Sequence, residues 1–169
     1  MNANEVIANL ALRHLGFKPG DYAQLNPNND VNMSQSTNDV YPTALRVATI
    51  LSTYRLMDAL AQLADAFAEK GREFNHVLKV GRTQLQDAVP MTLGQEFTAF
   101  AITLREDVNR LRDALPLVRE VSLGGTAIGT GINADPAYAD LAIAELSAIT
   151  GETLVRSENL VEATSDTGG

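Results

Sequence analysis

Two long segments with apolar side chains at steps of three and four residues constrain the fold more than any other feature of this sequence. The first runs from Pro42 to Glu73 and the second from Thr92 to about Glu120. At a rise of about 1.5 Å per residue, a helix of about 30 residues is a rod of roughly 45 Å. The first segment carries two apolar stripes, which indicates burial on more than one side. The sequence therefore predicts an all-α fold, a bundle of long helices.

The apolar positions define the faces that these helices are expected to bury. In the first segment one stripe is Leu56, Leu60, Leu63 and Phe67, and the other is Val47, Ile50, Tyr54, Met57, Ala61 and Ala64. In the second segment the seam is Leu93, Phe97, Phe100, Leu104, Val108, Leu111, Leu115 and Val118. Such spacing is typical of helices packed along their length. Pro116 is expected to kink or loosen the second helix, because proline cannot donate to the helical ladder.

Shorter elements flank the long ones. Residues 3–14 have the apolar spacing of a short helix, and residues 17–33 read as a polar loop. Between the long helices, residues 77–80 suit a short extended piece. A further helix is expected from Pro136 to Ile149, closed by Gly151. A last short helix is expected to have Ser157 as its cap.

Charge and composition exclude several classes of function. The net charge of −8 leaves no basic surface to neutralise phosphates, so a nucleic-acid partner is not expected. There is no cysteine and there are two histidines, which argues against zinc sites, and no metal or cofactor is implied. No apolar run approaches the roughly 20 residues of a membrane span. We expect neither a membrane partner nor a signal peptide, and a cytoplasmic protein is the default.

A dense group of neutral donors and acceptors precedes the first long helix, in VNMSQSTNDV at residues 31–40. Hydroxyl and amide groups can saturate the roughly four hydrogen bonds that a carboxylate accepts. The free N–H groups and positive dipole end of a following helix would strengthen such a grip. The structural alternative is that Ser36, Thr37 or Asn38 simply caps the helix. Residue types alone leave both readings open and favour the cap.

Two further segments have an unusual composition for connections between helices: one is rich in polar residues and the other in glycines. GRTQLQDA, residues 81–88, lies in a connection of about 18 residues, whereas helices in bundles usually need only about 2–8. It is either functional or a loop in which Arg82 pairs with Asp87. SLGGTAIGTGIN, residues 122–133, lacks the spacing of a nucleotide loop. Its glycines are better explained by close backbone approach to a ligand or a neighbouring chain.

Taken together and in this order, the segments resemble the aspartase/fumarase superfamily, most closely its aspartase branch. The similar stretches are MNANEVIANLAL, VNMSQSTNDVYPTALRVA, KVGRTQLQDAVPMTLGQEF and GGTAIGTGIN, which cover essentially the whole chain. The resemblance implies homotetramers built on long helices, with active sites assembled from several subunits. It implies a small dicarboxylate substrate and the reversible deamination of L-aspartate to fumarate and ammonia through an aci-carboxylate.

The resemblance also implies roles for individual residues. Ser36, Thr37 and Asn38 are expected to bind the substrate, and Thr83 and Gln84 to contact one of its carboxylates. Fumarate hydratases usually carry histidine where this chain has Gln84, which favours aspartase. Asn133, after the glycines, is a weaker candidate for shaping the site.

Departures from the family pattern limit what the chain is expected to do. The catalytic serine of the family lies on a loop of pattern G-S-S-x-x-P-x-K-x-N, and this sequence contains no such segment. We therefore expect no catalytic base in this chain, an internal fragment, and no activity from the chain alone. Residues 1–40 would end the N-terminal domain and residues 41–169 would begin the central helical domain. The alternatives are a fumarate hydratase or related lyase, and a non-catalytic helical scaffold for oligomerisation.

Overall fold

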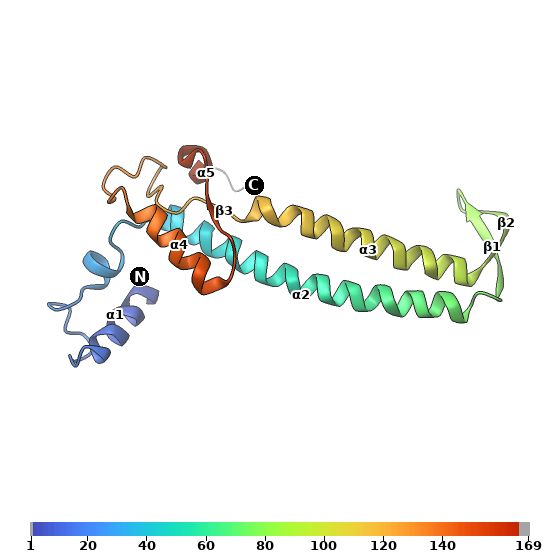
Figure 1. Ribbon diagram of the computed structural model, residues 1–169, viewed down its shortest axis with the longest axis horizontal. Coiled ribbons are helices and arrows are strands. Elements are labelled where there is room, and N and C mark those ends of the chain that lie inside the picture. The colour runs from blue at the N-terminus through green and yellow to red at the C-terminus, as the bar shows by residue number, and fades with distance from the viewer. Residues whose placement is uncertain (1, 166–169) are drawn as a thin grey trace. The chain divides into compact units, whose positions relative to one another are not determined.

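Helices dominate the computed structural model, which describes residues 2–165 (Figure 1). The helices are α1 (Asn2–His14), α2 (Thr37–Glu73), α3 (Leu93–Val118), α4 (Tyr138–Thr150) and α5 (Leu160–Ser165), with a π-helical turn η1 (Pro27–Val31). Short strands are β1 (Leu78–Thr83), β2 (Gln86–Thr92), β3 (Glu120–Val121) and β4 (Val155–Arg156). The predicted all-α, long-helix fold is confirmed.

The chain forms two compact units, and the boundary between them falls inside α2. One unit is residues 48–118, here called the hairpin unit, and the other comprises residues 1–47 and 119–169, here called the terminal unit. The predicted division into domains after residue 40 concerns the family fold and stays a prediction.

In the hairpin unit, α3 runs back along α2 in the opposite direction (Figure 1). Phenylalanine rings hold the two helices together near the turn: Phe67 lies 5.7 Å from Phe97 and 5.6 Å from Phe100, centroid to centroid. The backbones also approach closely, since a Cβ on Gly94 would lie 2.4 Å from the carbonyl oxygen of Gly71. Only glycine permits that approach, so the crossing is fixed by backbone as well as by ring packing.

The two predicted stripes of α2 have different surroundings. Ile50, Met57 and Ala64 of the second stripe are buried, whereas Leu56 and Leu63 of the first are 49% and 45% exposed. In α3, Ala101 and Leu115 are buried, and the helix continues through Pro116 to Val118. Helix α2 therefore carries more apolar side chains than the described part of this chain buries.

The connection between α2 and α3 is a β-hairpin, so the predicted single extended piece at residues 77–80 was too short. Strands β1 and β2 pair antiparallel from Leu78 opposite Thr92 to Thr83 opposite Gln86, with an irregularity at Gly81. A two-stranded ribbon is all edge, which is why Pro90 is tolerated inside β2.

The terminal unit contains both ends of the described chain and the start of α2. Strands β3 and β4 pair in parallel, Glu120 opposite Val155 and Val121 opposite Arg156. Its buried apolar residues are Ala8, Leu12, Val121, Leu123, Ala139, Ile143 and Leu154. Gly151 closes α4 in the left-handed conformation at φ 74°, as predicted.

The prediction for the last helix was wrong in its cap. The side-chain oxygen of Asn159 accepts from the N–H groups of Val161 and Glu162, at 3.0 and 3.2 Å. Ser157 is buried and donates its hydroxyl to the carboxylate of Glu120. Of the C-terminal run SDTGG, residues 166–169 lie outside the described part.

Candidate functional site

The predicted donor cluster lies at the N-terminus of α2, which begins at Thr37 rather than at Pro42. Ser36 is the helix cap: its Oγ accepts from the Asn38 N–H at 3.2 Å. Asp39, three residues on, accepts from the Ser36 N–H at 2.9 Å through Oδ1. These reciprocal bonds form a capping box, which satisfies two N–H groups that the first turn would leave without partners. The structural alternative considered for this segment therefore holds for Ser36.

Capping does not use up the donors of the cluster. Within the described part of the chain, the Ser36 hydroxyl accepts one hydrogen bond, from the Asn38 N–H, so its proton can still be donated. Thr37 is exposed, and within residues 2–165 no hydrogen bond involves its hydroxyl. Asn38 is exposed and donates one amide hydrogen to the Ala127 carbonyl at 2.6 Å, which leaves its second amide hydrogen for a ligand. The cap and an anion site are compatible here.

The glycine-rich loop, residues 122–133, is attached to this helix start. Both the Gly124 and Thr126 N–H groups donate to Oδ2 of Asp39, at 3.2 and 2.9 Å. Asp39 is fully buried, while Asn133 at the end of the loop is exposed. Two of the three segments singled out in the sequence thus meet within the terminal unit.

The glycines of this loop approach the chain's own helices. A Cβ on Gly124 would lie 2.4 Å from Cβ of Ala139 in α4, and one on Gly129 would lie 2.3 Å from backbone atoms of Val161 in α5. Both residues have positive φ, 91° and 89°. These glycines therefore approach neighbouring elements of the same unit. The predicted approach to a ligand or to a neighbouring chain stays a prediction.

Thr83 and Gln84 belong to the hairpin unit, at the turn between β1 and β2. Gln84 and Leu85 both have positive φ, 49° and 63°, as the two central residues of a type I′ turn require. Neither is the glycine or asparagine usual there, so the turn is strained. Leu85 is 99% exposed, and Thr83 and Gln84 are exposed as well.

The alternative considered for this loop is also realised, since Arg82 Nε lies 3.4 Å from Asp87 Oδ1 across the hairpin. Both side chains are largely exposed, and such pairs contribute little to stability. The ion pair therefore gives Arg82 and Asp87 a structural role in the hairpin. It gives no such role to Thr83 and Gln84, the two predicted binding residues.

A cavity of about 330 Å³ lies beside the glycine loop in the terminal unit. Its lining includes Thr130, Asp135, Tyr138 and Arg156. Burial, and after it the negative charge of Asp39, raise the pKa of the Tyr138 phenol above its ordinary value. The negative charge of Asp39 therefore acts on the phenol of Tyr138, a residue that lines this cavity.

Replacing Tyr138 with phenylalanine is expected to make the protein less sensitive to alkaline pH. A raised pKa in the folded state means that the unfolded chain loses the phenolic proton first. The contribution of Tyr138 is complete below the unfolded pKa of about 10 and is lost as pH rises through the folded pKa. Urea unfolding at about pH 9 and about pH 11 should show a smaller loss of stability in Tyr138→Phe than in the parent.

Tyr41→Phe is the matched control, because Tyr41 is 61% exposed. If both variants lose the same stability between the two pH values, the environment of Tyr138 is not the cause.

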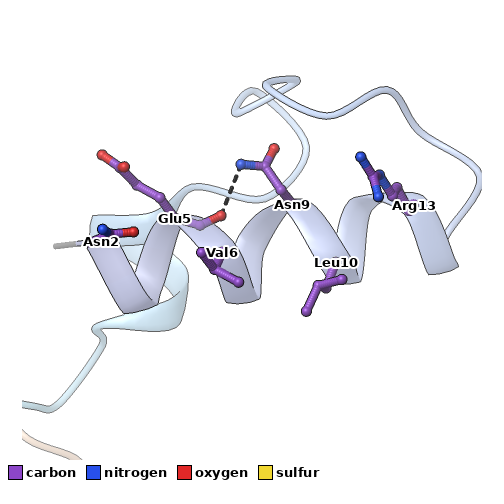
Figure 2. A pocket seen from close by; sticks show the side chains of 6 residues that line it. All are labelled: Asn2, Glu5, Val6, Asn9, Leu10 and Arg13. Atoms are coloured by element: carbon purple, nitrogen blue, oxygen red, sulfur yellow. Dashed lines mark hydrogen bonds between the residues drawn. The ribbon is translucent and has the colours of Figure 1, made fainter.

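Another hollow lies along one face of α1 (Figure 2). Its lining comes from successive turns of this single helix, with Val6 and Leu10 on one side and Glu5, Asn9 and Arg13 on the other. Asn9 donates to the Glu5 carbonyl at 2.9 Å and so is already engaged with its own helix. Among the described residues, all the residues that line this groove belong to α1, and we assign no site to it.

Residues 2–165 contain neither a candidate metal site nor a candidate membrane-spanning helix. In that range no cluster of three or more histidine or acidic side chains could hold a metal ion. Both histidines, His14 and His76, are exposed. No described helix is long and apolar enough to cross a bilayer.

The comparisons with known proteins place this chain in one class, the lyases of the aspartase/fumarase superfamily. The family model described as Lyase matches residues 1–168, and the chain belongs to this family. It is 63% identical over 169 residues to the aspartate ammonia-lyase of Pseudomonas canavaninivorans, covering 99% of this chain and 36% of that protein.

Solved structures agree with this assignment. The crystal structure of fumarate lyase:delta crystallin from Brucella melitensis bound to cobalt has a TM-score of 0.94 and 65% identity, over 99% of this chain and 36% of that one. Class II fumarase from Schistosoma mansoni has a TM-score of 0.87 and 30% identity, over 96% and 37%. The chain thus spans about a third of the length of its relatives.

Sequence reasoning missed Asp39, the carboxylate that accepts hydrogen bonds from both the helix start and the glycine loop. One signal was available: Ser36 and Asp39 have the S-x-x-[D/E] spacing of a capping box. The bonds from the glycine loop had no such signal, because their donors are backbone N–H groups distant in sequence.

Proposed function

We propose that this chain is part of an aspartate ammonia-lyase, which converts L-aspartate reversibly to fumarate and ammonia. The observation that carries the proposal is the cluster of available hydroxyl and amide donors at the start of α2, in a chain 63% identical to a protein of that name. The donors proposed to bind substrate are Ser36, Thr37, Asn38, Thr83 and Gln84.

The chemistry explains why such donors are neutral and numerous. A base removes a proton from C3, and the electrons of that bond pass into the adjacent carboxylate to give a dianionic aci-carboxylate. When they return, the C2–N bond breaks, the nitrogen leaves with its electron pair as ammonia, and the C2–C3 double bond of fumarate remains. Charge thus grows on carboxylate oxygens during the reaction, and groups that bind it best at that stage accelerate the step.

Other parts of the protein must supply the base. The serine loop of the family has no counterpart in this sequence, so the proposal assigns binding and anion stabilisation to this chain and proton removal to a segment outside it. We further propose a homotetramer in the cytoplasm, with residues 1–40 in the N-terminal domain and residues 41–169 in the central one. The exposed Leu56 and Leu63 of α2 support such association, because apolar stripes of this kind are usually buried between helices.

A fumarate hydratase is the second candidate, favoured by the likeness to the class II fumarase of Schistosoma mansoni. Two features weigh against it: the identity to that structure is 30%, and Gln84 stands where fumarate hydratases usually carry histidine.

A chimera tests the proposal directly. This chain would replace the matching third of the Pseudomonas canavaninivorans enzyme, so that all five proposed donors come from it. The chimera is expected to assemble as a tetramer and to form fumarate from L-aspartate, followed by ultraviolet absorbance, whereas the isolated chain should show no turnover. An assembled chimera that releases no ammonia would contradict the proposal and favour a scaffold. Turnover of malate in place of aspartate would favour the hydratase.

A further inference from the structure

Asp39 is a fully buried carboxylate on which two distant segments converge. Its Oδ1 accepts from the Ser36 N–H at 2.9 Å, and its Oδ2 accepts from the N–H groups of Gly124 and Thr126 at 3.2 and 2.9 Å. A buried charge is costly unless hydrogen bonds satisfy it. Here three backbone donors do so, and the same three bonds fix the backbone on both sides of the carboxylate.

Each bond constrains a residue next to a proposed donor. The bond from Ser36 sets the backbone of the turn that carries Ser36, Thr37 and Asn38. The bond from Thr126 holds a β-branched residue at φ 56°, a conformation that is unfavourable without such support. The following residue, Ala127, accepts from the side chain of Asn38 at 2.6 Å. The orientation of Asn38 therefore depends on the loop, and the loop depends on Asp39.

The chemistry of the side chain matters as much as its position. An asparagine at residue 39 would keep the shape, but one acceptor oxygen would become an NH₂ donor facing backbone N–H groups. A glutamate would keep charge and both acceptors while moving the carboxylate by one methylene. Asp39→Asn therefore tests the loss of an acceptor oxygen, and Asp39→Glu tests the displacement of both acceptor oxygens.

We propose that Asp39 is a positioning residue of the lyase reaction, whose carboxylate holds the helix start and the glycine loop so that the substrate-binding donors are preorganised. The inference rests on the proposed function. Displacement of a site group by about 1 Å can cost roughly 100-fold in rate. In the chimera, Asp39→Asn is expected to lower kcat and kcat/KM for aspartate together by about 100-fold, and Asp39→Glu by about tenfold.

Asp30→Asn is the matched control, because Asp30 is exposed and accepts from the Asn26 N–H at 2.6 Å in the same unit, at the start of η1. Its kcat should stay within about twofold of the parent. Circular dichroism measures the folded fraction of each variant, and a tenfold loss of kcat with a full helical signal cannot come from unfolding. In the 169-residue chain, hydrogen exchange at Gly124 and Thr126 should be slowest in the parent, faster in Asp39→Glu and fastest in Asp39→Asn.

The outcomes are separable. A chimera with native Asp39 that lacks activity overturns the proposed function and, with it, the role of Asp39 in catalysis. An active chimera in which both Asp39 variants keep kcat within about twofold overturns the positioning role alone. If Asp39→Asn fails to fold, Asp39→Glu decides, and unchanged kcat in that variant also overturns the inference.

Discussion

Replacing Gly129 with alanine is expected to destabilise the terminal unit by about 3–5 kcal/mol, as the sum of left-handed backbone strain and overpacking. Gly129 has φ 89°, and its new Cβ would lie 2.3 Å from Cα and N of Val161 and 2.4 Å from the carbonyl carbon of Leu160. These are backbone atoms of α5, so no side-chain rotation relieves the contact. Either α5 moves away from the glycine loop or the loop changes course.

The measurement is the free energy of unfolding from urea titration, with Gly20→Ala as the control. Gly20 lies in the same unit at φ 87°, and a Cβ there would meet nothing within 4 Å. That control should lose only about 1–2 kcal/mol, the cost of the left-handed conformation for a residue with a side chain. Equal losses in the two variants would show that the contact between loop and α5 contributes nothing.

The long helices could be predicted from the sequence because their cause is local and repeated. Apolar side chains at steps of three and four residues line one face of a helix, whichever element later packs against that face. Gly151 closes α4 because the helix end has a positive φ, which favours glycine. The start of α2 was placed too late for a physical reason. Pro42 suits the first turn of a helix, but α2 runs through it from Thr37, with Ser36 and Asp39 supplying the cap.

The hairpin and the Asp39 contacts could not be read from residue types. The turn at Gln84 and Leu85 lacks the asparagine–glycine signal of a type I′ turn. Burial alternates in β1 only from Leu78 to Arg82, and it does not alternate along β2. The two donors to Asp39 from the glycine loop lie 85 and 87 positions away and are backbone N–H groups, which every residue except proline possesses. The donor types at residues 36–38 could be read from the sequence, whereas the hydrogen bonds of Asp39 to the helix start and the glycine loop are visible only in the fold.

Replacing Thr83 with valine in the active chimera is expected to lower kcat/KM for aspartate by about 10²–10³-fold, the usual effect of removing one donor to a developing oxyanion. Valine has nearly the shape of threonine and suits a strand, so the fold has little reason to change. Thr83 is exposed at the end of β1, where substitutions usually alter stability by less than about 0.5 kcal/mol. We therefore expect Thr83→Val to lower activity while leaving stability nearly unchanged.

Thr83→Ser provides the control, because it keeps the hydroxyl and removes only a methyl group. Its kcat/KM should stay within about tenfold of the parent, while Thr83→Val falls well below it at the same urea midpoint. The reason is electrostatic: the hydroxyl is proposed to donate to an oxygen whose negative charge increases as the C3 proton leaves, and valine offers nothing in its place. Unchanged kinetics in Thr83→Val would remove Thr83 from the site and leave the donors at the start of α2 as this chain's remaining candidates.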